Sequence, residues 1–263
     1  MKTEDLPFCP IVSRDEWLRA RRALLQSEKE LTRRRDELAK KRRELPWVRI
    51  DKRYVFDAPD GRRGFADLFA GRSQLVVKHF MLGPGWREGC VGCSFEVDHL
   101  EGALVHLEHH DVKVVAVSRA PLAEIEAFKR RMGWRIDWVS SHGSDFNFDF
   151  HVSLTPEQVA SGKGYYNYRE EAVPSEELSG FSVFARDEAG NVYHTYSAYG
   201  RGAEEVMSTY MLLDLTPKGR NEGDVGNLTA WVRHHDRYGA GGYVDSAGRY
   251  VPPADGSCCA GGP

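Results

Sequence analysis

The chain has 263 residues, of which 41% are hydrophobic and 29% are charged, and its formal net charge is −3. These values are typical of a globular protein with a full hydrophobic core. No run of about 18 apolar residues occurs, so we expect no membrane span, and the N-terminus has no signal-peptide pattern. The five cysteines are an odd number, which argues against a framework of structural disulfides. The sequence therefore predicts a cytoplasmic protein without a membrane partner.

The first predicted element is a long helix. Ser13 and Glu16 have the spacing of a capping box, and neither Gly nor Pro follows before Pro46. The apolar side chains recur every seven residues and form one narrow stripe, which consists of Trp17, Leu24, Leu31, Leu38 and Leu45. Such a stripe fits against another surface, either the chain's own domain or a second copy. We expect residues 1–45 to be a separate unit, and we predict a homodimer.

The same helix concentrates positive charge. Residues 14–44 contain 12 Lys or Arg and 7 Asp or Glu, a balance of +5 that leaves −8 for the rest of the chain. A basic helix can dock on the acidic body of its own chain or of a second copy as readily as on an outside partner. No aromatic interleaving or recognised module accompanies the basic residues, so nucleic acid is not an expected partner.

Short apolar runs and helical patterns alternate from residue 46 to residue 140. The predicted strands are 47–56, 74–82, 113–118 and 135–140, and the predicted helices are 94–109 and 121–131. This order predicts an α/β fold with parallel crossovers. Residues 146–150 then alternate aromatic and polar side chains, which is a strand pattern. Residues 181–186 and 191–196 flank a turn and predict an antiparallel hairpin.

The most informative motif is Cys90-Val91-Gly92-Cys93, at the junction between a predicted strand and a predicted helix. The first sulfur stands at the helix N-terminus, where free N–H groups and the helix dipole stabilise a thiolate. The second lies one turn on, close enough to resolve a mixed disulfide. The spacing predicts redox chemistry at sulfur, with Cys90 attacking and Cys93 resolving.

Trp86 and Arg119 are the candidates to shape this site. An arginine close to a sulfur favours the thiolate. Arg119 closes the next predicted strand, at the edge of a parallel sheet where ligands bind.

A lone C-x-x-C motif is also compatible with half of a zinc site. Zinc usually takes four ligands, and no second Cys or His pair has the matching spacing, so we expect neither metal nor cofactor. His234-His235-Asp236 is a further cluster, but neighbouring helical side chains diverge by about 100° and cannot readily share one ion. We expect this segment to anchor the end of the chain instead.

The last predicted segment is a flexible tail rich in Gly and Pro, residues 239–263. It contains Cys258 and Cys259. The sequence assigns no role to these two cysteines or to Cys9.

Four separate stretches resemble one family: Gly85-Trp86 with Gly89-Cys90-Val91-Gly92-Cys93-Ser94-Phe95, Ser118-Arg119-Ala120-Pro121, Ser144-Asp145-Phe146-Asn147, and Trp231-Val232-Arg233-His234-His235-Asp236. They are similar to the bacterial thioredoxin-like proteins of domain-of-unknown-function family 899, commonly labelled predicted dithiol–disulfide oxidoreductases. The resemblance spans roughly residues 6–238. It implies a thioredoxin-like three-layer fold with a central mixed sheet over residues 46–238, an added N-terminal helix and an irregular C-terminal extension. It also implies closer kinship with peroxiredoxin-like members than with small thioredoxins.

The chain departs from thioredoxins and peroxiredoxins at three places. Gly89 stands where thioredoxins have tryptophan, and residues 177–181 lack the proline that precedes the final hairpin of thioredoxins. Arg87 stands where a peroxiredoxin has Thr or Ser.

Three functions therefore remain open. The first is a thiol–disulfide oxidoreductase, which acts on a disulfide substrate and is recycled by a cellular thiol reductant. The second is a thiol peroxidase, in which peroxide converts Cys90 to a sulfenic acid that condenses with Cys93. The third is a non-enzymatic protein in which the pair holds a metal or partner, or merely packs.

Overall fold

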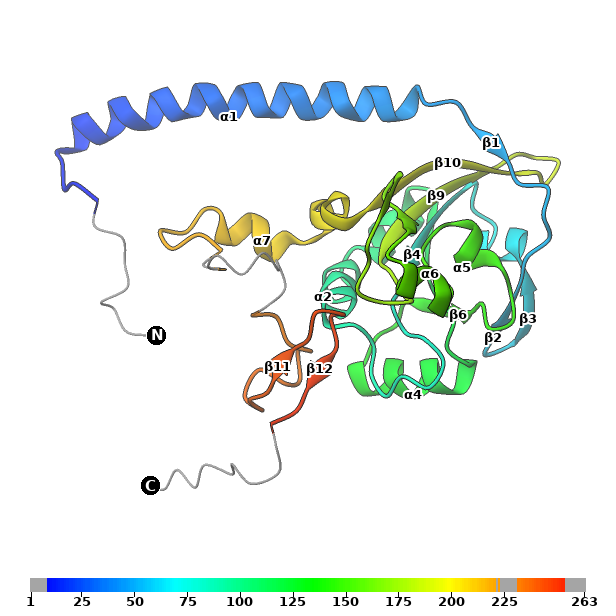
Figure 1. Ribbon diagram of the computed structural model, residues 1–263. Coiled ribbons are helices and arrows are strands. Elements are labelled where there is room, and N and C mark those ends of the chain that lie inside the picture. The colour runs from blue at the N-terminus through cyan, green and yellow to red at the C-terminus, as the bar shows by residue number, and fades with distance from the viewer. Residues whose placement is uncertain (1–8, 221, 223–230, 254–263) are drawn as a thin grey trace.

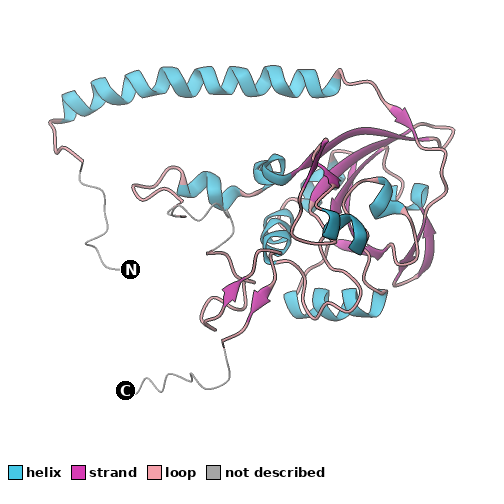
Figure 2. Cartoon of the chain, viewed as in Figure 1, coloured by secondary structure: helices cyan, strands magenta, loops and turns pink. Residues whose placement is uncertain are grey.

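An eight-stranded mixed sheet forms the centre of the structure, a computed structural model that describes residues 9–220, 222 and 231–253 (Figures 1 and 2). From one edge to the other the strands are β1 (Val48–Arg49), β10 (Val192–Tyr199), β9 (Gly180–Arg186), β4 (Gln74–His79), β5 (Val112–Ser118), β6 (Asp137–Ser140), β2 (Val55–Ala58) and β3 (Gly61–Gly64). Strands β4, β5 and β6 are parallel, whereas β9 is antiparallel to β4 and to β10. The α/β class with a mixed sheet is thus confirmed, as is the hairpin predicted from two alternating segments.

The predicted crossovers are present. Strand β4 leads through the C-x-x-C motif into α2 (Val91–Leu100) and α3 (Leu104–His109), and β5 leads through α4 (Leu122–Met132) into β6. The single helix predicted at 94–109 is therefore two helices. It also begins earlier than expected, so that the C-x-x-C motif forms the first turn of α2.

Helices cover both faces of the sheet and divide the core. Along β5, Val115 and Val117 belong to one apolar cluster and Val114 to another, because successive side chains of a strand point to opposite faces. The first cluster includes aromatic side chains of η2 (Phe65–Phe69) and α5 (Phe146–Asp149). The second packs side chains of α2 and α4 against the sheet and includes both cysteines of the motif. This is the three-layer arrangement that the resemblance implies.

Two predicted strands are wrong. Residues 146–150 begin with the short helix α5, in which Phe146 and Phe150 pack with ring centroids 4.8 Å apart. Residues four apart share a face in a helix as well as in a strand, so the aromatic pattern does not distinguish the two. Residues 47–56 contribute to two strands, β1 and β2, which lie near opposite edges of the sheet.

The N-terminal helix is α1 (Arg14–Arg43), and the capping box of Ser13 and Glu16 is confirmed. None of its residues is buried, and its apolar stripe is 44–56% exposed from Trp17 to Leu45. Near its C-terminal end, Arg42 forms two hydrogen bonds of 3.1 Å with Glu205 of the body. Figure 1 shows α1 running alongside the body. No helix in the described ranges is long and apolar enough to cross a membrane.

The C-terminal part described, residues 231–253, packs against the motif. It contains a small ribbon of β11 (Tyr243–Val244) and β12 (Tyr250–Val251). Of the tail predicted to be flexible, residues 239–253 carry this ribbon, whereas Cys258 and Cys259 lie outside the described residues. The other elements are α6 (Pro156–Ser161), β7 (Gly164–Tyr166), β8 (Arg169–Glu171), η3 (Gly200–Val206) and α7 (Ser208–Leu213).

Candidate active site

The two cysteines of the motif lie together at the start of α2. Cys90 is the N-cap residue and is 6% exposed, and Cys93 lies in the first turn and is 1% exposed. Both are free thiols. The amide of Cys90 donates to the carbonyl of Met81 at 3.0 Å, and the Cys90 carbonyl accepts from the amide and the hydroxyl of Ser94 at 3.0 and 2.8 Å. The motif is thus fixed to the chain that leaves β4.

The residue before the motif is so closely packed that any side chain larger than that of glycine would force its neighbours to shift. A Cβ atom on Gly89 would lie 2.4 Å from a ring carbon of Phe80 and 2.8 Å from one of Phe128. The carbonyl of Gly89 accepts a hydrogen bond of 2.9 Å from Nε2 of the buried His234. Asp236, two residues further on, pairs with Arg131 of α4 at 2.8 Å. The cluster at 234–236 therefore anchors the C-terminal segment beside Cys90, as the sequence predicts.

A buried ion pair lies next to Cys93. Lys78 of β4 is completely enclosed and pairs with Glu96, which is one helical turn beyond Cys93 on α2. Lys78 Nζ also donates to Ser179 Oγ at 2.6 Å. A buried ammonium group is tolerated only with such partners, because its desolvation costs several kcal/mol.

The electrostatic environment favours a thiolate on Cys93. Burial alone would raise the pKa of Cys93, but the hydrogen bond from Cys90, the positive charge of Lys78 and the amide of Met81 at 3.5 Å lower this pKa to about 5. The hydrogen bond to Cys93 and burial raise the pKa of Cys90 above its ordinary value. The two sulfurs of the reduced pair therefore share one proton, and the charge of Lys78 favours ionisation at Cys93.

This charge distribution differs from the sequence-based expectation, which places the thiolate on Cys90. The expectation relies on free N–H groups at the start of α2. The first of these, the amide of Val91, donates to the carbonyl of Gly248 at 2.8 Å. The backbone of Cys93 does lower the pKa of Cys90, but the side-chain hydrogen bond to Cys93 and burial outweigh it.

The ionisation of the two charged neighbours is coupled to the pair. Burial raises the pKa of Glu96 to about 7, against the opposing charge of Lys78. Burial would lower the pKa of Lys78, but the charges of Cys93 and Glu96 outweigh it and raise this pKa. Lys78 thus stays protonated at neutral pH, where Glu96 titrates.

A cavity of about 570 Å³ opens onto the cysteine pair, and both cysteines line it. Its other walls come from the segment before β9, from η3 and α7, and from a turn of the C-terminal segment. The apolar and aromatic contributors are Met81, Tyr166, Pro174, Leu178, Met207 and Tyr210. The site can therefore hold a molecule against the sulfurs.

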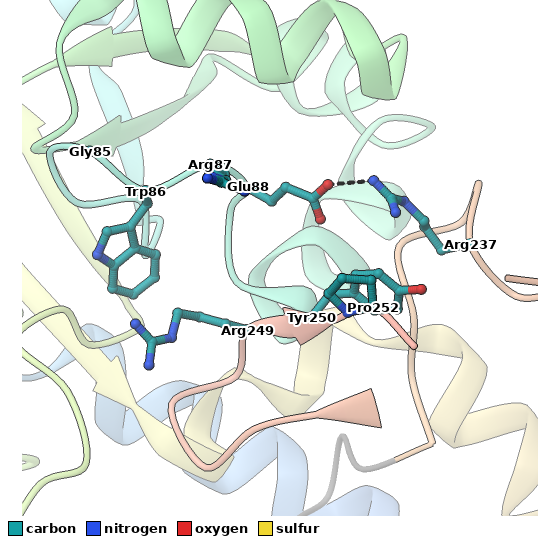
Figure 3. Close-up of a pocket in the computed structure, with 8 residues that line it drawn as sticks. All are labelled: Gly85, Trp86, Arg87, Glu88, Arg237, Arg249, Tyr250 and Pro252. Atoms are coloured by element: carbon teal, nitrogen blue, oxygen red, sulfur yellow. Dashed lines mark hydrogen bonds and ion pairs between the residues drawn. The ribbon is translucent and has the colours of Figure 1, made fainter. Parts of the chain in front are cut away.

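Arg119 and Trp86 lie in a neighbouring cavity of about 370 Å³ instead. Arg119 Nε donates to the buried Glu177 at 2.6 Å, and its guanidinium lies 4.8 Å from the ring centroid of Phe148. Trp86 faces Arg249, whose guanidinium is 5.6 Å from the Trp86 ring (Figure 3). The structure thus brings Cys90 and Cys93 together in one cavity, whereas Arg119 and Trp86 line the neighbouring cavity. The role of these two residues in tuning the pair stays a prediction.

Sequence reasoning missed Lys78, Glu96 and Gly248. Of these three, only Lys78 could have been noticed in the sequence, because a lysine inside a buried apolar strand requires a partner. The described ranges contain no group of three or more His, Cys, Asp or Glu side chains placed to hold a metal ion.

Comparison with known proteins identifies the family. The model of a family described as "Bacterial protein of unknown function (DUF899)" matches residues 7–238, whereas no curated protein has a matching sequence. Solved structures with similarity include a cysteine-to-serine mutant of PrxQ from Xylella fastidiosa (14% identity, 62% of this chain and 89% of that chain, TM-score 0.38). Others are the peroxidoxin BcpB from Mycobacterium tuberculosis (12%, 63% and 95%, 0.40) and a putative protein disulfide isomerase from Bacteroides thetaiotaomicron (14%, 68% and 95%, 0.38). Scores and identities this low carry no argument about activity. The chain belongs to the DUF899 family.

Proposed function

We propose that this protein is a dithiol–disulfide oxidoreductase that uses the Cys90–Cys93 pair. The observation that carries the proposal is the enclosed ammonium group of Lys78 next to two free thiols that line one cavity. Positive charge close to a thiol lowers its pKa and makes it reactive at neutral pH. Two cysteines that merely pack do not need a buried charge.

The reaction starts from one thiolate and one thiol. Cys90 lies at the helix start and attacks one sulfur of the substrate disulfide while its proton passes to the thiolate of Cys93. This step forms a mixed disulfide and releases the first substrate thiolate, which takes the proton back from Cys93. Cys93 then attacks Cys90 Sγ, forms the Cys90–Cys93 disulfide and releases the second thiolate. Two electrons pass to the substrate, and a cellular thiol reductant returns them.

Glu96 is suited to proton exchange in this cycle. It lines the same cavity as the two sulfurs, and burial raises its pKa to about 7. A group that titrates near the working pH can both give and accept a proton. We propose that Glu96 protonates the second leaving thiolate.

The test is the redox midpoint potential of the pair. The protein is equilibrated with thiol buffers of defined potential, trapped with an alkylating reagent and analysed by mass spectrometry. A reversible two-electron transition between about −120 and −300 mV is expected for a working oxidoreductase. The Cys9→Ser variant, altered at an exposed cysteine, should behave like the wild type. Failure to form a Cys90–Cys93 bridge would end the proposal, and consumption of hydrogen peroxide without disulfide exchange would replace it with a peroxidase.

We also propose that the protein is a homodimer joined through α1. The helix has 30 residues and none is buried, although Trp17, Leu24, Leu31 and Leu38 repeat every seven positions. Two such helices would cover each other's stripe as in a coiled coil. The mass in solution should be that of a dimer, and Leu24→Glu with Leu31→Glu should give a monomer. A monomeric wild-type protein at high concentration would contradict the proposal.

The compartment we propose is the cytoplasm, because the free thiol pair there would be kept reduced between turnovers.

A further inference from the structure

A turn of the C-terminal segment lies directly on Cys90. We call residues 239–253 the strap. Within its turn, the amide of Gly248 donates to the carbonyl of Asp245 at 3.0 Å, and the Asp245 carboxylate accepts from the amides of Ala247 and Arg249 at 2.9 Å each. A Cβ atom on Gly248 would lie 2.8 Å from Cys90 Sγ. The turn therefore leaves no room for even a methyl group between its backbone and the sulfur.

The strap is held in place at further points. Arg237, just before it, pairs with Glu88 of the loop that precedes the motif, and the Arg237 guanidinium lies 4.9 Å from the ring centroid of Tyr250. Figure 3 shows Arg249 reaching from the strap toward Trp86, and the dashed line in it joins Glu88 to Arg237. These contacts fix the strap to the loop that precedes the motif, so the strap covers Cys90 as an ordered part of the structure.

The strap occupies the space beside Cys90 in which an extended polypeptide would have to bind. A peptide bound at a main-chain edge takes its affinity from main-chain hydrogen bonds. Here the amide of Val91 already donates to Gly248 of the strap. What remains open beside the sulfurs is the cavity of about 570 Å³, which is within the range of small-molecule sites.

The walls of this cavity are mostly apolar, and their charges are paired. Glu96 is paired with Lys78. Glu204 is paired with Arg201 at 2.6 Å and with Arg220 at 3.2 Å. A cavity of this kind accepts a neutral apolar or aromatic molecule more readily than an ionic one, because an ion would lose its hydration without a free partner.

We propose that the substrate is a low-molecular-weight disulfide with a neutral, apolar or aromatic body, and that the strap excludes disulfides of folded proteins. This inference rests on the proposed function. One substrate sulfur bonds to Cys90 and the other leaves as a thiol; closure of the Cys90–Cys93 disulfide then releases the second thiol. Dithiothreitol supplies the two electrons beforehand: it reduces the pair and is removed before the disulfide is added.

The test compares three disulfides in single-turnover reactions with the reduced full-length protein: neutral di(2-pyridyl) disulfide, its anionic counterpart 5,5′-dithiobis(2-nitrobenzoate), and insulin. Each rate constant is divided by that of free dithiothreitol with the same disulfide, which removes differences in intrinsic reactivity. The corrected rate for the neutral disulfide should exceed the other two by at least about tenfold, equivalent to 1.4 kcal/mol.

The strap itself is tested by a double variant, Arg237→Ala with Arg249→Ala. The matched control is the separate variant Arg135→Ala, which removes an ion pair with Glu101 outside the strap. The double variant should accelerate insulin reduction several-fold, whereas the control should not. Equal corrected rates for insulin and the neutral disulfide in the wild-type protein would overturn this inference and leave the proposed function standing. Failure of all three disulfides to oxidise the pair would overturn both.

Discussion

The carboxylate of Glu96 pairs with the ammonium group of Lys78 in the closed interior next to Cys93. The two side chains come from different layers, because Lys78 belongs to β4 and Glu96 to α2. The pair therefore ties the helix that carries the cysteines to the sheet. It also places a permanent positive charge next to the thiol of Cys93. These two consequences can be separated by mutation.

The first prediction concerns reactivity. Lys78→Met should raise the pKa of Cys93 toward ordinary values and lower the alkylation rate of the reduced pair at pH 7 by at least about tenfold, because fewer thiolates are present. The rate is measured with iodoacetamide as a function of pH. Lys78→Arg keeps the charge and should retain most of the reactivity. An unchanged pH profile in Lys78→Met would show that this charge does not control the thiol.

The second prediction concerns stability. Lys78→Met leaves Glu96 buried without its partner and should lower the free energy of unfolding by about 3–5 kcal/mol. The double variant Lys78→Met with Glu96→Leu replaces both charges by apolar groups and should recover most of this loss without recovering the reactivity. Urea unfolding of the reduced proteins measures both values. Recovery of reactivity in the double variant would contradict the conclusion that the charge of Lys78 makes the thiol of Cys93 reactive.

The third prediction follows from the pKa of Cys93. Below about pH 5 both sulfurs of the reduced pair are protonated, so two protons accompany two electrons. Above this pKa and below that of Cys90, only one proton does. The midpoint potential should therefore fall by roughly 30 mV per pH unit between about pH 6 and 8, instead of roughly 59 mV.

Glu96 also titrates in this pH range, so the Glu96→Gln variant is the control that isolates the sulfurs. A slope of roughly 59 mV in both proteins would mean that neither sulfur is ionised at neutral pH.

The sequence predicts the motif, the crossover order and the final hairpin because each depends on residues close together in the chain. It does not predict the partners of the motif. Lys78 is separated from Cys93 by the loop that joins β4 to α2, and Gly248 reaches Cys90 from the far end of the chain. Sequence spacing is silent about such long-range contacts, and for that reason it takes no account of the charge of Lys78 or of the bond between the first amide of α2 and Gly248.

The fourth prediction tests the packing in front of the motif. Gly89→Ala places a methyl group against Phe80 and Phe128, and it should lower the free energy of unfolding by about 1–3 kcal/mol, as overpacking does. Gly102→Ala is the matched control, because no atom lies within 4 Å of the position that its Cβ would take. Chemical unfolding compares the two. Equal stabilities would mean that the loop before Cys90 can move aside without cost.

The fifth prediction concerns the contact between the strap and Cys90. Gly248 has a φ of +78°, and a Cβ atom there would lie 2.8 Å from the sulfur, so Gly248→Ala should displace the turn. Cys90 should then be alkylated several-fold faster, as read by mass spectrometry of each cysteine. Gly190→Ala is the control, since Gly190 has a φ of +86° with nothing within 4 Å. It carries the same backbone strain without touching the site, so it should leave the alkylation of Cys90 unchanged. If Gly248→Ala leaves this rate unchanged or lowers it, the strap does not limit access to the sulfur.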